Sequence, residues 1–418
     1  MDRLPAIVRW SLAVTSLTLL VGCPAPPPPA DTGSGAATPG PTATTTPAES
    51  SNPGATRQWG PADGIPIGGY MSLTDAYASF GISSNKAMGL AIEEINAAGG
   101  VNGKPLTLYM EDAESKQEVA KNAVRRLMDT RKVCVVVGEV ASSLSLAVAP
   151  DCQAAGVPMV SPSSTNPTLT QKGDYIFRTC FTDDQQGAYV ATFALQKGYK
   201  NGVLLRDINS DYSKGQSKVI HERFTAGGGK IVADEGYEQK QQDFNAVLTK
   251  IKPLNPDVIF VPGYYTEAGL ILKQARELGI KAAFVGADGW DSPVVQEIAG
   301  DQVNTGVYFV NHYSKSEERP KVKEFVASFR AKYNEDPDAL AACAYDAIYV
   351  VADAIKRAGS TEPKAVRDAI AATKDFDGVT GVITIDAQRN ASKPCVVLTF
   401  KDGQQALETT LTPADLKS

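Results

Sequence analysis

The amino-acid sequence predicts an α/β protein with two lobes, each built on a parallel β-sheet that is covered by helices. From residue 65 onwards, short apolar runs rich in Val, Ile and Phe alternate with amphipathic stretches that end in glycine. Strands separated by helices of about 10–15 residues are typical of parallel sheets with helices on both faces. The pattern begins again after residue 180, and a chain of 418 residues is long enough for two domains.

The elements of the first lobe follow from the hydrophobic period and the helix end signals. Strands are expected over Ile65–Leu73, Leu106–Glu111, Val133–Val137, Val157–Val160 and Tyr175–Cys180. Helices are expected over Ser84–Ala98, from a capping box at Ser115 to Thr130, and over Ser143–Ala155. The run Val133–Val137 is apolar throughout, as is typical of a strand buried on both faces.

The second lobe repeats this pattern. Its strands are expected near Val203–Arg206, Ile231–Ala233, Val258–Val261, Ala283–Val285 and Val307–Val310. Its helices are expected over Tyr212–Thr225, Phe244–Ile251, Glu267–Leu278 and Pro293–Ala299, the last capped by Ser292. Three more helices, Lys321–Tyr333, Ala339–Ala358 and Pro363–Ala372, precede a hairpin-like pair, Val382–Ile385 and Cys395–Phe400.

Residues 1–22 read as a secretory signal peptide. Arg3 and Arg9 precede an apolar run, Trp10–Val21, that is too short to span a bilayer. The four residues ending at Cys23 resemble the bacterial lipobox, in which the cysteine is lipidated; an ordinary secretory signal with an incidental Cys23 is the alternative. Residues 23–60 are rich in Pro, Thr and Ala and read as a disordered tether. We therefore expect a bacterial envelope protein held on the periplasmic or extracellular face of a membrane by lipid on Cys23.

Composition and motifs argue against nucleic-acid binding, metal binding and catalysis. The net charge is −6, so there is no basic surplus to neutralise phosphates. The two histidines, His221 and His312, are far apart and in no ligand spacing. No P-loop, dinucleotide fingerprint, GxSxG, HExxH or EF-hand motif is present, and Gly227–Gly229 reads as a helix end. We expect no enzyme, no cofactor and no metal.

The cysteines that follow Cys23 leave two interpretations open. They contain no CxxC pair, and they could be buried free thiols that pack as small apolar side chains. A disulfide is the alternative, and Cys134–Cys152 is the first pair to test, because a strand and the helix after it can pack together.

Several of the expected strands are followed by Ser, Thr, Tyr or Asp, at positions where an ordinary turn would have Gly and Asn. The segments that carry this pattern, together with one helix, are Ala91–Gly100, Gly138–Ser143, Ser161–Pro167, Asp207–Tyr212 and Gly286–Trp290. With them the sequence resembles the class I periplasmic binding proteins of ABC transporters, and most nearly their leucine/isoleucine/valine-binding and related amino-acid or amide receptors.

The resemblance covers residues 65–410 and implies two Rossmann-like lobes that hinge around a ligand cleft. On this view residues 61–182 form lobe 1, to which 311–378 return, and residues 183–310 form lobe 2, to which 379–413 return.

The resemblance also implies the polar ligand contacts. Ser142 occupies the place of the serine that binds the ligand α-carboxylate. Ser163, through its backbone N–H, and Thr165 complete that grip. Asp288 occupies the place of the acidic residue that pairs with the α-ammonium, where the branched-chain receptors have Glu. Ala141 stands at the family's disulfide position, so that bond is absent.

Aromatic residues complete the implied site. Tyr212 and Tyr264 fall at aromatic positions of the family, and Phe80 falls at the mouth of the cleft. Together with Trp290 they predict an apolar or aromatic wall for the ligand side chain. Each of the four could instead be a packing residue.

Elementary chemistry supports the polar assignments independently. Ser142 precedes the expected helix, whose free N–H groups attract an anion, and a buried ammonium needs a carboxylate such as Asp288. Structural alternatives exist: Ser142 or Ser143 could cap the helix, Ser163 and Thr165 could be turn residues, and Asp288 could belong to an ordinary turn.

We therefore expect a lipid-anchored, monomeric substrate-binding protein that closes on a small apolar or aromatic amino acid and presents it to the permease of an ABC importer. A receptor for an amide or urea, and a sensory receptor that passes closure to a kinase, are alternatives within the same fold. An enzyme that uses the cleft is the alternative from a different class.

Overall fold

The computed structural model describes residues 57–417. The expected signal peptide, Cys23 and the expected tether up to residue 56 lie outside the described residues. The last residues expected in the tether instead form a strand, β1 (Arg57–Trp59), which pairs antiparallel with β3. The aromatic Trp59 is the reason, because its ring packs over Gly89 and its indole N–H donates to Asn85 at 3.0 Å.

The first sheet has six strands in the order β1-β3-β2-β4-β5-β6, and all pairs except β1–β3 are parallel. Its strands after β1 are β2 (Ile65–Met71), β3 (Leu106–Asp112), β4 (Val136–Val137), β5 (Met159–Ser161) and β6 (Ile176–Arg178). The intervening helices are α1 (Ala78–Ala97), α2 (Gln117–Asp129) and α3 (Ser142–Ala155). This confirms the predicted strand–helix alternation, although β4 is shorter than expected.

The second sheet has seven strands in the order β15-β14-β11-β10-β9-β7-β8, parallel from β8 to β11. Its strands are β7 (Asn201–Asp207), β8 (Lys230–Tyr237), β9 (Val258–Phe260), β10 (Ala283–Gly286), β11 (Val307–Asn311), β14 (Cys395–Lys401) and β15 (Gln404–Leu411). Its helices are α4 (Asp183–Gln196), α5 (Asp211–Ala226), α6 (Asn245–Ile251), α7 (Tyr265–Glu277) and α8 (Pro293–Ala299). Ser292 caps α8 as expected, accepting from the Val294 N–H at 3.2 Å.

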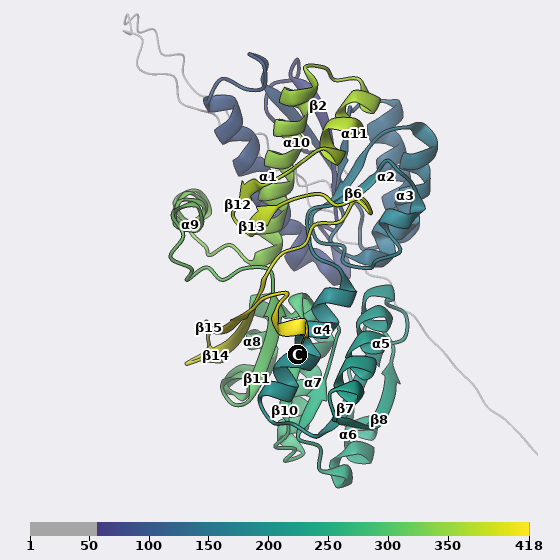
Figure 1. Ribbon diagram of the computed structural model, residues 1–418, viewed down its shortest axis with the longest axis vertical. Helices are drawn as coiled ribbons and strands as arrows, with labels where there is room; N and C mark the ends of the chain where they lie inside the picture. The colour runs from purple at the N-terminus through teal and green to yellow at the C-terminus, as the bar shows by residue number, and fades with distance from the viewer. Residues whose placement is uncertain (1–56, 418) are drawn as a thin grey trace, which may run out of the picture. The chain divides into compact units, whose positions relative to one another are not determined.

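After β11 the chain returns to the first sheet. Helix α10 (Ala339–Ala358) lies beside α1, and α11 (Pro363–Ala371) packs on α10 (Figure 1). Helix α9 (Pro320–Tyr333) contacts α10 through the Phe325 and Tyr345 rings, 4.7 Å apart. The chain then crosses back, because β14 joins β11 in the second sheet. Three segments therefore connect the two lobes: β6 to α4, β11 to α9, and β13 to β14.

Two local expectations were wrong. The expected hairpin of Val382–Ile385 with Cys395–Phe400 does not form: β13 (Gly381–Ile383) pairs with β12 (Phe376–Gly378), and β14 pairs with β11 and β15. Ser115 does not open a capping box, since α2 begins at Gln117 after Lys116. The Ser115 hydroxyl instead donates to the Thr74 carbonyl at 2.9 Å and closes a loop across lobe 1.

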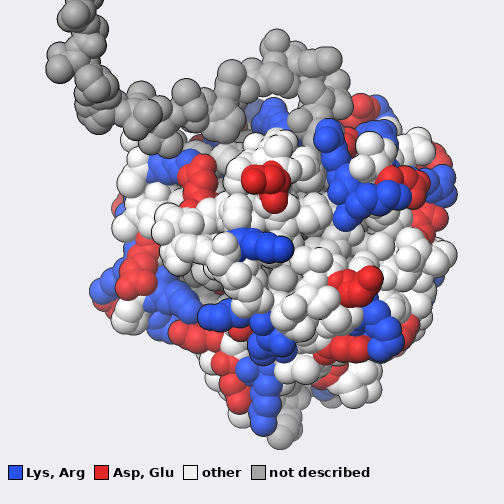
Figure 2. Space-filling view, turned by 90° about the horizontal axis from the view of Figure 1, so that it is seen from above, with Lys and Arg blue, Asp and Glu red and all other residues white. Residues whose placement is uncertain are grey.

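The described cysteines are free and buried, including Cys134 and Cys152. On the surface, the face drawn in Figure 2 shows Lys and Arg side chains interspersed with Asp and Glu rather than gathered in a patch of one sign. Within residues 57–417, no helix combines the length and the apolar character that a membrane span requires.

Helix α1 passes so close to the end of β2 that a side chain at Gly81 has no room. A Cβ atom on Gly81 would lie 1.8 Å from the carbonyl oxygen of Ser72, the residue after β2. The preceding residue of the helix, Phe80, lies fully inside the protein. The fold thus brings α1 into contact with residues at the carboxyl end of the first sheet.

Gly81→Ala tests this close approach. Alanine in an ordinary helix stabilises by about 1 kcal/mol relative to glycine, but here we expect the overpacked Cβ to lower the free energy of unfolding by about 1–3 kcal/mol. Ile82→Ala, at the exposed neighbouring position, is the control and should change stability by about 0.5 kcal/mol at most. Urea denaturation gives both values, and a stabilised Gly81→Ala protein would contradict the packing described.

Candidate functional site

The predicted ligand residues lie at the carboxyl ends of the parallel strands of both sheets. Ser142, Ser163 and Thr165 follow β4 and β5 in the first sheet, whereas Tyr212, Tyr264 and Asp288 follow β7, β9 and β10 in the second. All six are buried, with exposed fractions between 1% and 7%. Open α/β sheets bind ligands at this edge, so we call these six residues the interlobe site.

The first-sheet part of the site offers hydrogen-bond donors, and the buried Arg178 guanidinium behind it donates to the carbonyls of Ser164 and Asn166, both at 2.6 Å. Ser142 is the first residue of α3, and the N-cap, Ala141, provides no side-chain cap, which rules out the capping alternative for Ser142. The Ser142 hydroxyl accepts from the Asn166 N–H at 3.2 Å, and this contact ties the two loops together. The Ser163 hydroxyl is buried and has no hydrogen-bond partner among the described residues. A helix N-terminus and a vacant hydroxyl are suited to an anionic group.

A buried carboxyl group that the sequence analysis missed holds these loops in place. Glu139 accepts from the backbone N–H groups of Ser72 and Ala141, both at 2.6 Å, and it is fully buried. Burial raises the pKa of Glu139. Its carbonyl oxygen also accepts from the hydroxyls of Ser161 and Ser164, each at 2.8 Å. The end of β2 and the loops after β4 and β5 are thus fixed to one another.

The second-sheet part of the site is a carboxylate beside two tyrosines. The Tyr212 hydroxyl donates to Asp288 Oδ1 at 2.7 Å and accepts from the Gly289 N–H at 3.1 Å. The ring of Tyr264 stacks on that of Tyr212, with centroids 5.1 Å apart. Burial raises the pKa values of both tyrosines well above 10, so both keep their protons. Asp288 therefore is more than an ordinary turn residue.

The other two predicted aromatic residues have different surroundings. Phe80 meets Tyr264 edge-on at 6.2 Å and Tyr265 at 4.7 Å, so it joins the aromatic group across the lobes. Tyr77, which was not predicted, also contacts Tyr264, at 4.7 Å. Trp290 is fully buried, and its indole N–H donates to the Val261 carbonyl at 3.0 Å while its ring packs on Gly286. These contacts are those of a packing residue at the end of β10.

Direct contacts join the two lobes around the site. The Ser143 hydroxyl donates to Asp211 at 3.2 Å, and the Asn166 amide donates to the Asp211 carbonyl at 3.0 Å. In addition, Lys240 forms an ion pair with Asp75 at 2.9 Å. These residues belong to different sheets, so the described arrangement holds the lobes together.

A second missed carboxyl group, Asp183, lies between the two parts of the site. It is fully buried at the start of α4, its N–H donates to the Thr165 carbonyl at 2.8 Å, and its Oδ1 accepts from Gln216 at 3.3 Å. Burial raises the pKa of Asp183 to about 8, and the nearby Asp288 charge adds to this rise, while the Thr165 and Gln216 side chains oppose it. Asp183 is therefore largely protonated at pH 7, which leaves Asp288 as the charged carboxylate of the pair.

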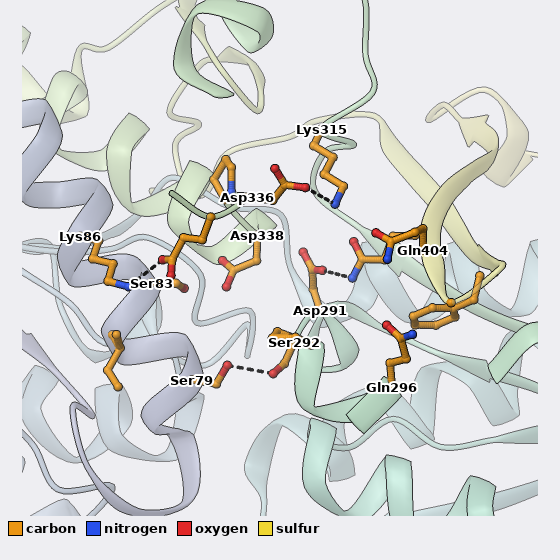
Figure 3. A pocket seen from close by; sticks show the side chains of 17 residues that line it. Ser79, Ser83, Lys86, Asp291, Ser292, Gln296, Lys315, Asp336, Asp338 and Gln404 are labelled. Carbon is orange, nitrogen blue, oxygen red and sulfur yellow. Dashed lines mark hydrogen bonds and ion pairs between the residues drawn. The ribbon is translucent and has the colours of Figure 1, made fainter. Parts of the chain in front are cut away.

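A separate cavity of about 380 Å³ lies between α1, α8 and the β14–β15 hairpin (Figure 3). Across it the hydroxyls of Ser79 and Ser292 are 2.8 Å apart, and Asp291 accepts from Gln405 at 2.7 Å. None of the predicted ligand residues lines this cavity. The described residues also contain no group of His, Cys, Asp and Glu arranged to hold a metal ion.

Comparisons with known proteins agree with this geometry. Residues 64–405 match the family model described as periplasmic binding protein. The leucine-, isoleucine-, valine-, threonine- and alanine-binding protein of Pseudomonas aeruginosa is 32% identical over 329 residues, which are 78% of this chain and 86% of that protein.

Two solved structures are similar throughout the folded part. A leucine-binding protein LivK from Thermotoga maritima is 38% identical, with a TM-score of 0.80, and the match covers 84% of this chain and 99% of that chain. The branched-chain amino-acid transporter substrate-binding protein LivJ from Streptococcus pneumoniae, solved in complex with isoleucine, is also 38% identical, with a TM-score of 0.79 and the same coverage.

Asp183→Asn tests the protonated state of this carboxyl group. An unfolded Asp has a pKa of about 3.9, so the folded protein, with its pKa of about 8, loses a proton on unfolding between these values. Stability should therefore fall as the pH rises from about 4 to 8, by at most about 1.4 kcal/mol per pH unit from this group. Urea denaturation at pH 5, 6, 7 and 8 should show a flatter dependence in Asp183→Asn. Asp184→Asn, the exposed neighbour in the same helical turn, should keep the parent slope; equal slopes in both variants would contradict the assignment.

Proposed function

The chain belongs to the periplasmic binding protein family, and we propose that it binds a small zwitterionic amino acid with an apolar or aromatic side chain between its lobes. The observation that supports this proposal best is the division of the interlobe site. Hydroxyl and helix N–H donors lie on the first sheet, and the Asp288 carboxylate lies on the second. An α-carboxylate and an α-ammonium are the two groups that such a site recognises.

The family consists of binding proteins, and this confirms the expectation that the chain is not an enzyme. The side-chain preference is supported by a group of aromatic residues around Tyr264. The ring centroids of Tyr77, Phe80 and Tyr212 lie 4.7 to 6.2 Å from that of Tyr264. The relatives named above are described as binding leucine, isoleucine or valine, and these are the first ligands to test.

A carboxylate ligand without a cation is the main competing candidate. A solute-binding protein from Rhodopseudomonas palustris BisB5, 26% identical with a TM-score of 0.75, was solved with 3,4-dihydroxybenzoic acid. Such a ligand, like an amide or urea, would leave the buried Asp288 carboxylate without a positive partner, and that arrangement is costly. The buried Asp288 therefore favours the amino acid.

The lobes proposed are residues 61–182 with 311–378, and 183–310 with 379–413. The packing of α10 against α1 and the pairing of β14 with β11 support this division. The pairing of β13 with β12, however, places the last crossing after β13 rather than at residue 379. We propose that the three connecting segments act as a hinge, and that the closed lobes present the ligand to the permease of an ABC importer. A ligand-sensing role remains an alternative use of the same closure.

Membership of the family places the protein in the periplasm or on the extracellular face. We propose in addition that residues 1–22 are removed, that Cys23 carries lipid, and that the segment after it tethers a monomeric binding domain to the membrane. The support is the sequence alone: an apolar run too short to span a bilayer, followed by Cys23 and a proline-rich stretch.

Asp288→Asn distinguishes the ligand classes. Asparagine keeps the size of the side chain but removes its charge, so a buried ammonium loses its partner at a cost of about 3–5 kcal/mol, or about two to four orders of magnitude in Kd. Ser142→Ala should cost less, about 1–3 kcal/mol, because the helix N–H groups still contact the carboxylate. Calorimetry with L-leucine, L-isoleucine and L-valine measures both effects.

Asp301→Asn is the matched control, since Asp301 is exposed on the same lobe and its substitution should leave Kd unchanged. Binding by Asp288→Asn within threefold of the parent would show that the ligand ammonium does not depend on Asp288, and the amino-acid proposal would lose its main support.

Cys23→Ser tests the lipid anchor. Without the thiol no lipid can be attached, so the variant should leave the membrane fraction and should no longer partition into detergent. Ser34→Ala, in the same proline-rich stretch, is the control and should fractionate like the parent. Retention of Cys23→Ser in the membrane to the parental extent would reject lipidation at this residue.

A further inference from the structure

Asp288 has a second contact that the proposed function does not explain. Nε2 of His312, at the end of β11, lies 2.9 Å from Asp288 Oδ2, while Tyr212 donates to the other oxygen. The His312 side chain is completely buried, and its ring stacks on Phe181 with centroids 4.0 Å apart and planes inclined by 24°. The carboxylate is thus held at both oxygens in one orientation.

The charges around this pair leave Asp288 without a cationic partner from the chain. Within residues 57–417 no Lys or Arg forms an ion pair with Asp288. Besides His312, the titratable side chains on which the Asp288 charge acts include Cys180, Asp183, Tyr212, Tyr264 and Cys343. Burial raises the pKa of each, so all five are mainly neutral at pH 7. The buried Arg178 guanidinium acts on Cys180 and Asp183 and donates to the carbonyls of Ser164 and Asn166. Lys393 lies near the two cysteines and donates to Thr380.

The surroundings of the second ring nitrogen of His312 indicate whether the side chain is a neutral imidazole or an imidazolium. His312 Nδ1 is buried and has no hydrogen-bond partner among the described residues. An imidazolium would leave an N–H unpaired there, and an unsatisfied buried donor on a charged group is costly. The neutral tautomer with its proton on Nε2 satisfies Asp288 and leaves only a bare acceptor at Nδ1.

We infer that His312 is a neutral positioning residue that orients the Asp288 carboxylate without cancelling its charge, and thereby makes the site specific for a ligand ammonium. Two neutral donors, Tyr212 and His312, fix the carboxylate while its negative charge stays uncompensated. An imidazolium in the same place would supply the cation itself and remove the preference for a charged amine. The inference rests on the proposed function, because it assumes an amino-acid ligand.

The first test compares two ligands that differ only at the α-position: L-leucine, and 2-hydroxy-4-methylpentanoate, in which a hydroxyl replaces the ammonium. His312→Phe keeps an aromatic ring against Phe181 but has no donor. By calorimetry we expect it to weaken leucine binding at least tenfold and hydroxy-acid binding less than threefold. His312→Gln, whose amide places a neutral N–H near the former Nε2, should restore leucine binding to within about threefold of the parent.

An unchanged ratio of the two Kd values in His312→Phe would overturn the inference, whether both affinities fall together or neither changes, since general damage to the fold weakens both ligands alike. Failure of the proposed function looks different, because the parent itself would then bind none of L-leucine, L-isoleucine and L-valine. In that case the second test still decides the state of His312.

The second test reads the tautomer directly. The chain has only two histidines, His221 and His312, so nitrogen NMR of protein labelled in histidine gives two pairs of ring-nitrogen signals, and His221→Gln assigns the pairs. We expect His312 to be neutral and to carry its proton on Nε2, with and without leucine. An imidazolium signal from His312 at pH 7, or a proton on Nδ1, would contradict the inference.

Discussion

The direction of the parallel strands is the constraint on which the rest of the structure depends. In each sheet the carboxyl ends of the strands meet at one edge, and the residues after β4, β5, β7, β9 and β10 are therefore brought together from distant parts of the chain. The two edges face each other, and three crossings of the chain are the covalent links between the sheets within the described residues. The same arrangement explains why small residues are needed where elements approach closely, as at Gly81 beside Ser72.

Much of this could be predicted from the sequence. The alternation of apolar runs and amphipathic stretches predicted the order of strands and helices, and α8 and α10 have the predicted bounds. The polar residues after the strands predicted which side chains belong to the site, because their position depends only on strand direction. Errors arose where long-range contacts override local signals: Ser115 bonds to Thr74 instead of capping a helix, and β14 pairs with β11 instead of β13.

The supporting residues of the site could not be predicted for the same reason. His312 is 24 residues from Asp288, and Glu139 is 67 residues from Ser72, so no local spacing connects them. The roles of His312 and Glu139 depend on their burial in the folded protein, and the residue type alone does not show that a side chain is buried. The wide spacing of the two histidines argued against a metal site, whereas the place of His312 at the end of β11 puts it against the carboxylate after β10.

Burial also determines how the proposed site can hold a charged ligand. Taking charges out of water is costly unless they are paired. Asp183 avoids that cost by keeping its proton, because burial raises its pKa to about 8, and the buried Arg178 guanidinium donates to the carbonyls of Ser164 and Asn166. One uncompensated carboxylate faces hydroxyl and N–H donors that carry no formal charge. A zwitterion brings one positive and one negative group, so its ammonium can pair with Asp288 while its carboxylate lies at the positive end of the α3 dipole. A ligand of either single charge would leave one of these two ends without its complement.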